Sequence, residues 1–408
     1  MACSSNRRAL CWCGGDEMIR GAVKVAGRGF LVGVGLHLGQ QLVRGVASGK
    51  ILAQYVSPWT LLLSLCVCVV SPAVFLRYLP LVDCVRFASF IAAAGSTYKL
   101  TLSLLRQAYN TDNGWPAVVA GCAAGLTSLI DDPSRRRTLS LFILARALGA
   151  LVLTLHRRGK LPTVPYFVVL AFGVCESLII YSTVHYPTLL PRSYYTAILS
   201  WSRYFTEDKL KLFFRVPSLH FLPCSAGLHP GSCNSYALTD FFHSLFLYIK
   251  IYLSIYSLPL VLFRTKSLWT HTITALRTLL NNTLVSALFL AVDGALVKYT
   301  LCLLRNGYGH APPLPAWIAL LSGFLGAAGL LIERHSRRLE LLYYVLPQVL
   351  YGVWRVLCIK KPLNLHKIPC GSVWVFCASL AVIFHSFERE HLSLSPLINT
   401  ALHRLLDT

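Results

Sequence analysis

The feature that most constrains the fold is a series of long apolar stretches that contain almost no charge. Residues 164–186, VPYFVVLAFGVCESLIIYSTVHY, hold one acidic residue, and comparable stretches recur along most of the chain. Their apolar residues run on without strict alternation, which is the pattern of helices and not of half-buried strands. A bilayer admits only helices and closed barrels, because backbone polar groups must be paired internally there. We therefore expect an all-α polytopic membrane protein.

Composition agrees with this expectation. Hydrophobic residues make up 55% of the chain and charged residues 13%, whereas a soluble globular domain has about 25% charged residues. Lys and Arg outnumber Asp and Glu by 38 to 16, a net charge of +22. These basic residues are spread between the apolar stretches and form no single basic stripe. We therefore expect them to contact anionic headgroups of the lipid bilayer, and we expect no nucleic-acid partner.

The two halves of the sequence resemble each other. Trp115 aligns with Trp317 and Gly121 with Gly323 when the sequence is shifted by 202 positions. Upstream the shift becomes 199, and GSTYKLTLSLLR (95–106) aligns with GALVKYTLCLLR (294–305). Chance similarity between apolar helices aligns Leu with Leu, but it rarely also aligns Trp, Lys and Gly in order. The sequence therefore predicts two tandem homologous helical repeats packed as a pseudo-two-fold bundle, as in many transporters.

Each half divides into six expected helices. The first repeat, with a polar N-terminus, covers residues 1–186, a charged connector containing Cys and His covers 187–236, and the second repeat covers 237–408. The expected helices are 21–47, 58–79, 84–106, 115–130, 138–157, 164–186, 237–263, 266–280, 281–305, 316–332, 338–358 and 371–388. The segment 266–280 is expected to lie in the membrane interface, because its apolar residues form one stripe. Neighbouring basic loops conflict under the positive-inside tendency, so the orientation stays open.

Small residues spaced four apart indicate close packing of some helices. Gly29 and Gly33, and likewise Gly121 and Gly125, have this spacing, which lets helix backbones approach closely in lipid.

The segments LIDDPSRRR (129–137) and LIERHSRR (331–338) are expected to be equivalent turns at one membrane face. In each, an acidic residue precedes a serine, and two arginines follow at the start of the next helix. We expect the serine to cap that helix and the acid to pair with an arginine, which gives the turns a structural role. The residues concerned are Asp131, Ser134, Arg135, Arg136, Glu333, Ser336, Arg337 and Arg338.

Four ionisable residues interrupt the apolar stretches: Lys99, Glu176, Asp293 and Lys298. Such residues are candidates for a polar path for an ion, a lipid headgroup or a small solute. The alternative, which we favour, is that the lysines extend to a membrane interface and that Glu176 pairs with a basic neighbour.

The segment HFLPCSAGLHPGSC (220–233) contains four residues of metal-ligand type: His220, Cys224, His229 and Cys233. Together they could hold a tetrahedral zinc ion, although the spacing is not that of a standard finger. Reduced thiols are the interpretation we favour, with structural zinc and a disulfide as the alternatives. No cofactor is otherwise expected, and the sequence lacks HExxH, Gly-x-Ser-x-Gly and His-x4-Asp motifs, so no catalytic residues are assigned and an enzyme is not expected.

Several of these segments also resemble a known family. The Cys-rich stretch with His229-Pro230, the helix from Gly294 to Arg305 and the Ile332 to Arg338 turn are similar to those of the transmembrane protein 135 family, also described as peroxisomal membrane protein 52. The likeness covers most of residues 220–405 and, more loosely, 60–205. A more distant similarity, through small-xxx-small helices, leads to the inner-membrane translocase channel subunits.

The resemblance implies a multi-pass protein of the peroxisomal membrane, the mitochondrial membrane or both. It implies roles in peroxisome organisation, mitochondrial fission balance and lipid homeostasis, with fission or organelle-biogenesis proteins as partners. The alternative is a solute or lipid transporter or pore built on the two-fold repeat. A membrane-embedded lipid enzyme is a third hypothesis, which the missing motifs disfavour.

Overall fold

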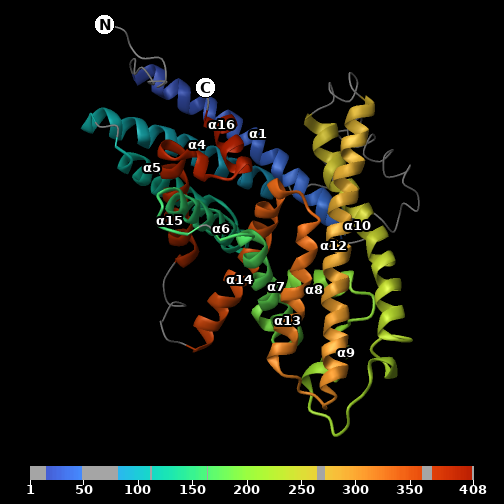
Figure 1. Ribbon diagram of the computed structural model, residues 1–408. Coiled ribbons are helices and arrows are strands. Elements are labelled where there is room, and N and C mark those ends of the chain that lie inside the picture. Colours follow the sequence, from blue (N-terminus) through green and yellow to red (C-terminus); the bar gives the residue numbers. More distant parts are fainter. Residues whose placement is uncertain are drawn as a thin grey trace. The chain divides into compact units, whose positions relative to one another are not determined.

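A computed structural model of the chain describes residues 15–47, 81–110, 113–162, 164–263, 272–360 and 370–406. Every regular element in these ranges is a helix, which confirms the expected all-α class (Figure 1). The helix expected at 58–79 lies outside the described residues.

The helices of the N-terminal half follow the apolar stretches closely. They are α1 (Gly15–Ala47), α4 (Leu81–Tyr109), α5 (Trp115–Leu126), the 3-10 turn η1 (Thr127–Ile130), α6 (Pro133–Arg157), α7 (Phe167–His185), the 3-10 turn η2 (Pro187–Leu189) and α8 (Arg192–Trp201). The connector then forms three short elements, α9 (Glu207–Leu210), the π-helical turn η3 (Lys211–Arg215) and η4 (Cys224–Ala226).

The C-terminal half begins with α10 (Cys233–Phe263). It continues with α12 (Thr272–Tyr308), α13 (Ala316–Gly326), η5 (Ala327–Leu331), α14 (His335–Lys360), α15 (Gly371–Arg389), η7 (His391–Ser393) and α16 (Pro396–Leu406). The order long helix, short helix, 3-10 turn, two long helices, 3-10 turn, short helix thus occurs from α4 to α8 and again from α12 to α16.

One expected boundary is wrong. The segments 266–280 and 281–305 were expected to be separate helices, but Thr272–Tyr308 is a single helix of 37 residues. The Asn281-Asn282 pair at the expected break supplies neither Pro nor Gly, and Asn costs well under about 1 kcal/mol inside a helix. The backbone hydrogen bonds therefore continue through it. A helix of this length exceeds the roughly 20 residues that span a bilayer.

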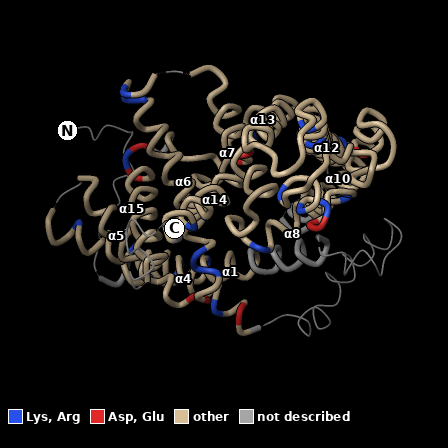
Figure 2. Tube along the Cα trace, turned by 90° about the horizontal axis from the view of Figure 1, so that it is seen from below, with Lys and Arg blue, Asp and Glu red and all other residues tan. Residues whose placement is uncertain are grey.

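Six described helices are long and apolar enough to cross a membrane. They are Pro133–Arg157, Phe167–His185, Cys233–Ser257, Thr272–Tyr308, His335–Cys358 and Gly371–Arg389. The shorter apolar segments are Trp115–Ile130 and Ala316–Leu331. Long stretches of tube without charge are visible in Figure 2, and α5 and α13 contain no charged residue. Many apolar side chains on these helices are exposed, among them Val174 at 53% and Trp374 at 61%.

The contacts divide the described chain into two compact units. Unit 1 comprises Met1–Gln41, Ser57–Leu161 and Cys370–Thr408, and unit 2 comprises Leu42–Val56 and Pro162–Pro369. In unit 1, α15 packs on α5 and α6; in unit 2, α7 packs on α13 and α14. Unit 1 therefore contains α15, the last long helix of the C-terminal half, and unit 2 contains α7, the last long helix of the N-terminal half.

Glycines set the closest helix contacts in both units. In unit 1, a Cβ atom at Gly121 would lie 2.8 Å from Ala381 Cα. In unit 2, a Cβ atom at Gly323 would lie 2.7 Å from Ser177 Cα. Gly29 and Gly33 of α1 likewise meet the backbone of α4 in unit 1. Only a residue without a side chain permits backbones to come this close.

Candidate metal centre and buried polar groups

Four metal-ligating side chains converge in unit 2. Cys224 lies in η4, His229 in the following turn, Cys233 at the start of α10, and Cys302 on α12. One ligand atom from each lies within 4.8 Å of the other three. The turn between η4 and α10 bends the connector back at Gly227 and Gly231, whose φ angles are +153° and +71°. This turn brings three ligands to one side of α12.

The predicted ligand set is therefore wrong in one member. His220 is not part of the group; its fourth member is Cys302 of α12, which lies far from the other three in the sequence. His220 is exposed, and its backbone carbonyl accepts a hydrogen bond from Ser218. Two of the four members are shielded from solvent, because Cys224 and His229 are 1% and 2% exposed.

Neighbouring side chains hold the four residues in place. Asn306 accepts a hydrogen bond from the Cys224 thiol at 3.2 Å and donates one to Cys233 Sγ at 3.3 Å. The His229 ring stacks on Tyr236 with 4.2 Å between ring centroids. Nε2 of His229 lies 3.6 Å from Cys302 Sγ, while its Nδ1 is buried without a hydrogen-bond partner.

The chemistry of the group fits a tetrahedral divalent metal. Zn²⁺ binds three thiolates and one imidazole in known structural sites, at bond lengths of about 2.0–2.3 Å. Tetrahedral geometry with those bond lengths places ligand atoms about 3.3–3.8 Å apart. The observed limit of 4.8 Å therefore requires a closure of roughly 1 Å around an ion. The group can hold a metal ion without rearrangement of the helices.

Arg305 lies one helical turn after Cys302 and is completely buried. Its guanidinium donates to the carbonyl oxygens of Phe213 and Leu222, and to Cys224 Sγ at 3.4 Å. In the described part of the chain it has no carboxylate partner. A buried unpaired cation is costly, so this site favours a compensating negative charge on the sulfur atoms.

The arginine of unit 1 that aligns with Arg305 has a different partner for its positive charge. Arg106 aligns with Arg305, and it pairs with Glu388 at 2.9 Å. Val184 occupies the position in α7 that corresponds to Glu388 in α15, and it is buried and apolar. The cysteine group thus stands where unit 1 has a carboxylate.

Hydrogen bonding to Cys302 and the positive charge of Arg305 lower the pKa of the Cys224 thiol to about 5. A thiolate is the form that binds metal.

Of the expected polar residues in apolar helices, the two lysines have different surroundings. Lys298 forms a buried ion pair with Asp240 of α10. Lys99 is half-buried, and its Nζ donates to the Leu406 carbonyl at 3.5 Å in α16. The favoured interpretation, that the lysines extend to an interface, is therefore wrong for Lys298.

Glu176 of α7 and Asp293 of α12 contact each other inside unit 2. The two carboxyl groups share a hydrogen bond, and Glu176 Oε2 and Asp293 Oδ1 are buried without another partner. The basic neighbour expected for Glu176 is absent from the described residues around it. Two adjacent carboxylates cannot both be ionised, so a proton or a cation must accompany this pair.

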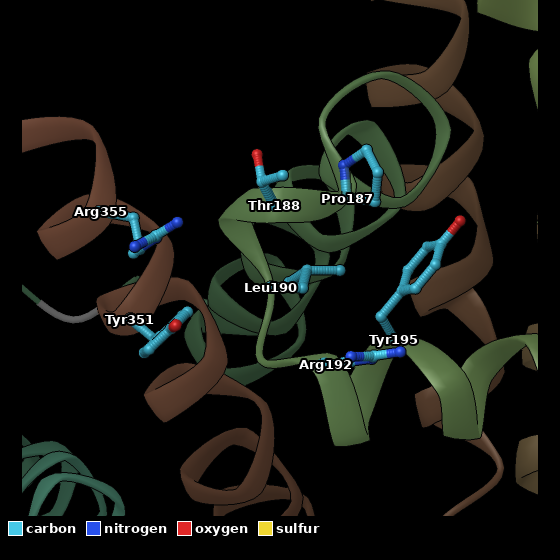
Figure 3. Close-up of a pocket in the computed structure, with 7 residues that line it drawn as sticks. All are labelled: Pro187, Thr188, Leu190, Arg192, Tyr195, Tyr351 and Arg355. Carbon is cyan, nitrogen blue, oxygen red and sulfur yellow. The ribbon is translucent and has the colours of Figure 1, made fainter. Parts of the chain in front are cut away.

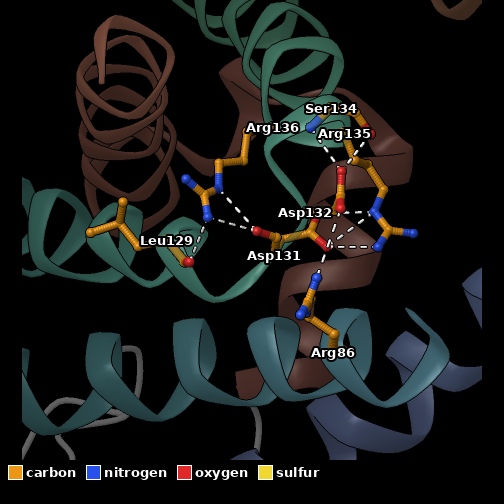
Figure 4. A network of polar contacts seen from close by, with 7 residues as sticks. All are labelled: Arg86, Leu129, Asp131, Asp132, Ser134, Arg135 and Arg136. Carbon is orange, nitrogen blue, oxygen red and sulfur yellow. Dashed lines mark hydrogen bonds and ion pairs between the residues drawn. The ribbon is translucent and has the colours of Figure 1, made fainter. Parts of the chain in front are cut away.

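The two charged turns have matching contacts. In the first, Arg136 donates to the carbonyls of Asp131 and Leu129 at 3.0 and 2.7 Å (Figure 4). In the second, Arg338 donates to the carbonyls of Glu333 and Leu331 at 2.9 and 2.7 Å. These carbonyls end a 3-10 turn, so each arginine satisfies backbone groups that the helix cannot pair.

The acidic residues of the turns are buried and paired. Asp131 is 1% exposed and pairs with Arg135 at 2.8 Å, and Glu333 is 2% exposed and lies 3.7 Å from Arg337. The second turn is further tied to α12, because Ser286 donates to Glu333 and accepts from Arg337, each at 2.6 Å.

The capping role expected for the serines is wrong. Asp132 is the N-cap of α6, and its carboxylate accepts the Ser134 backbone N–H at 2.8 Å. Hydrogen bonds from the Ser134 hydroxyl and backbone lower the pKa of Asp132. Pro133 at the first helical position fixes this register. In the second turn α14 begins at His335, and the Glu333 carboxylate accepts a hydrogen bond from the backbone N–H of Arg334.

Replacing Arg337 and Arg338 together with alanine should lower the amount of folded, membrane-inserted protein. Glu333 would stay buried without its cation, and the η5 carbonyls would lose their donor, at about 1–3 kcal/mol for each unpaired group. The measurement is abundance after alkaline extraction of membranes. Arg137 and Arg404, both exposed, provide the matched double-alanine control. Normal abundance with loss of a specific function would instead make the turn a functional site.

Among the residues of these networks that were not found from the sequence are Cys302, Arg305 and Asp240. Asp240 and Arg305 stand near helix ends, where a charged residue is ordinary, and Cys302 resembles any small apolar residue. The sequence did contain one signal, since Cys302 aligns with the polar Ser103 when the two halves are compared.

Comparison with family models, with curated proteins and with solved structures finds no match in any of the three.

Proposed function

We propose that the chain is a non-enzymatic multi-pass protein of the peroxisomal membrane, the mitochondrial membrane or both. The observation that carries the membrane assignment is the set of six long apolar helices, with large side chains such as Val174 and Trp374 exposed. Each of the six helices carries at least one exposed large hydrophobic side chain, as helices in contact with lipid would. The organelle, and a role in organelle organisation, fission balance and lipid homeostasis, rest on the family resemblance of residues 220–405.

The proposed architecture is an internal duplication in which the two copies exchange their last helices. The identical order of elements supports it, as do the matching arginine contacts of Arg136 and Arg338. The glycine contacts support it further, because Gly121 and Gly323 meet corresponding residues of α15 and α7. A pseudo-two-fold relation between the units is part of this proposal.

Within unit 2 we assign a structural zinc ion to Cys224, His229, Cys233 and Cys302. Zinc would fasten the connector to α12, since three ligands precede α10 and the fourth lies 69 positions after Cys233. Three thiolates, one neutral imidazole and Zn²⁺ carry a net charge of −1, which Arg305 balances. Metal binding of this kind contributes directly to folding free energy.

Locating a tagged full-length copy in cells tests the organelle assignment. The expected result is resistance to alkaline extraction and co-sedimentation with peroxisomal and mitochondrial markers. Release by alkaline carbonate would refute the membrane assignment, and residence in another membrane would refute the organelle.

A transporter is the second candidate, favoured by the Glu176–Asp293 pair. The corresponding positions in unit 1 are Leu380 and Ala94, so the duplicated fold does not require the two carboxyl groups. Proton or cation flux into liposomes, with Glu176→Gln as the inactive variant, would identify this function. If liposomes with the wild-type protein, liposomes with the Glu176→Gln variant and empty liposomes all show the same flux, the transporter function is excluded.

A further inference from the structure

A cavity in unit 2 has the chemistry of an anion site. It has a volume of about 360 Å³ and opens between η2, the start of α8 and the end of α14 (Figure 3). Its lining residues are Pro187, Thr188, Leu190, Arg192, Tyr195, Tyr351 and Arg355. Figure 3 shows Tyr351 and Arg355 on one wall and Arg192 and Tyr195 on the other. Leu190, which is 4% exposed, forms an apolar floor.

Both arginines lack an anionic partner. Within the described ranges neither Arg192 nor Arg355 forms an ion pair. Arg355 Nε is buried and has no hydrogen-bond partner, and a buried guanidinium N–H without an acceptor is unfavourable. The two positive charges therefore make the cavity a place where an anion is stabilised.

Neutral donors complete the set. Thr188 and Tyr351, which each carry a hydroxyl group, are lining residues, and the Tyr195 hydroxyl accepts a hydrogen bond from Arg215 at 3.3 Å. Helix α8 begins at Arg192 without a side-chain cap, so its first backbone N–H groups have no acceptor within the helix. Two guanidinium groups with hydroxyls and free amides match the several oxygens of a phosphate group.

Unit 1 shows that the fold does not need these residues. At the corresponding positions, α16 has Pro396 and Asn399 in place of Arg192 and Tyr195, and α6 has Gly149 and Leu153 in place of Tyr351 and Arg355. The same helices and 3-10 turn form there without the two arginines. The positive charges of Arg192 and Arg355 are therefore not needed for the fold, and they are available to bind a ligand.

The cavity also lies at the C-terminal ends of two candidate membrane spans. The candidate spans Phe167–His185 and His335–Cys358 both end beside it. In a protein inserted through these spans, the ends of the helices lie in the headgroup layer, where lipid phosphates are concentrated.

We propose that this cavity binds a phosphate group, supplied by a phospholipid headgroup or by a soluble phosphate. Arg192 and Arg355 contact the phosphate oxygens from opposite walls, and Tyr351 and Thr188 donate further hydrogen bonds. The lipid source rests on the proposed membrane insertion, whereas binding of a soluble phosphate does not.

The test uses the purified full-length chain in two arms. In the first, the protein in nanodiscs of phosphatidylcholine is titrated with phosphatidic acid, and retained lipid is measured by native mass spectrometry. In the second, inorganic phosphate is titrated into detergent-solubilised protein by calorimetry. We expect Arg192→Gln with Arg355→Gln to weaken binding by at least about a hundredfold, since each charged contact contributes about tenfold or more.

Matched variants keep the outcome interpretable. Arg137→Gln with Arg404→Gln changes net charge equally at exposed positions and should leave binding unchanged. Arg355→Lys keeps one charge and should weaken binding less than Arg355→Gln, with the same thermal midpoint. Binding in the lipid arm alone assigns the phosphate to lipid, and binding in the soluble arm alone assigns it to a soluble ligand. No binding in either arm, or equal loss in the surface double variant, overturns the proposal.

Discussion

Cys302→Ser should remove the metal from the purified protein and unfold the connector of unit 2. Structural zinc contributes apparent binding free energies of about 10–16 kcal/mol in small domains, so losing one of four ligands removes a large share of the local stability. Arg305 would then be left buried beside two thiols and an imidazole without full charge compensation. The measurements are zinc per mole of protein by mass spectrometry and thermal unfolding with and without chelator.

Two substitutions separate ligation from general damage. Cys358→Ser makes the same change in α14, outside the group, and should leave zinc at one per chain. His220→Ala should also retain zinc, because the histidine is exposed and apart from the four ligands. If the wild-type protein contains no zinc and a chelator does not change its thermal unfolding, the zinc assignment is wrong and the four residues are reduced thiols and a free imidazole.

Gly323→Ala should destabilise the protein by about 1–3 kcal/mol or more, the usual range for overpacking. The new methyl group would lie 2.7 Å from Ser177 Cα and 2.8 Å from the Glu176 carbonyl oxygen. Those atoms are backbone and cannot rotate away, so α7 and α13 must separate. The Ser177 hydroxyl, which donates to the Leu320 carbonyl at 2.8 Å, would lose its contact as well. Chemical unfolding in detergent measures the effect.

The contact between α5 and α15 in unit 1 supplies a second test of close packing at a glycine. Gly121→Ala places a methyl group 2.8 Å from Ala381 Cα and should cost a similar amount. Gly307→Ala is the control, because nothing lies within 4 Å of its added Cβ. It should be neutral or stabilising by up to about 1 kcal/mol, through the reduced entropy of the unfolded chain. A neutral Gly323→Ala would show that α7 does not pack on α13 in this way.

The helices were predictable because long apolar stretches leave a chain little choice, and because Pro133 and the charged turns mark where helices begin. The prediction of a helix break at Asn281 was wrong. The apolar stripe of residues 266–280 suggested a separate interfacial helix, but no Pro or Gly near Asn281 stops the helix. Helix partners were harder. Because the sequences of α7 and α15 resemble each other, as do those of α5 and α13, local patterns cannot say whether α7 packs on α5 or on α13.

The metal group was predictable only in part, for a related reason. Cys224, His229 and Cys233 are close in sequence and stand in a turn-rich segment, so spacing alone brought them forward. Cys302 joins them through the packing of α10 against α12, a long-range contact that leaves no mark in local spacing. His220 has a side chain that can bind zinc, but it lies before the turn at Gly227 and Gly231 and does not reach the other ligands.

The packing of α15 on α5 and α6 has a consequence for how the protein is made. Unit 1 is interrupted between Leu161 and Cys370, so α5 and α6 emerge from the ribosome long before their partner α15. At translation rates of about 5–20 residues per second, the intervening 208 residues take roughly 10–40 s. During that time the glycine face of α5 has no native partner, and it must be shielded by lipid or by an insertion factor. A premature stop codon anywhere before Gly371 would therefore remove α15 and leave α5 and α6 of unit 1 without the helix on which they pack.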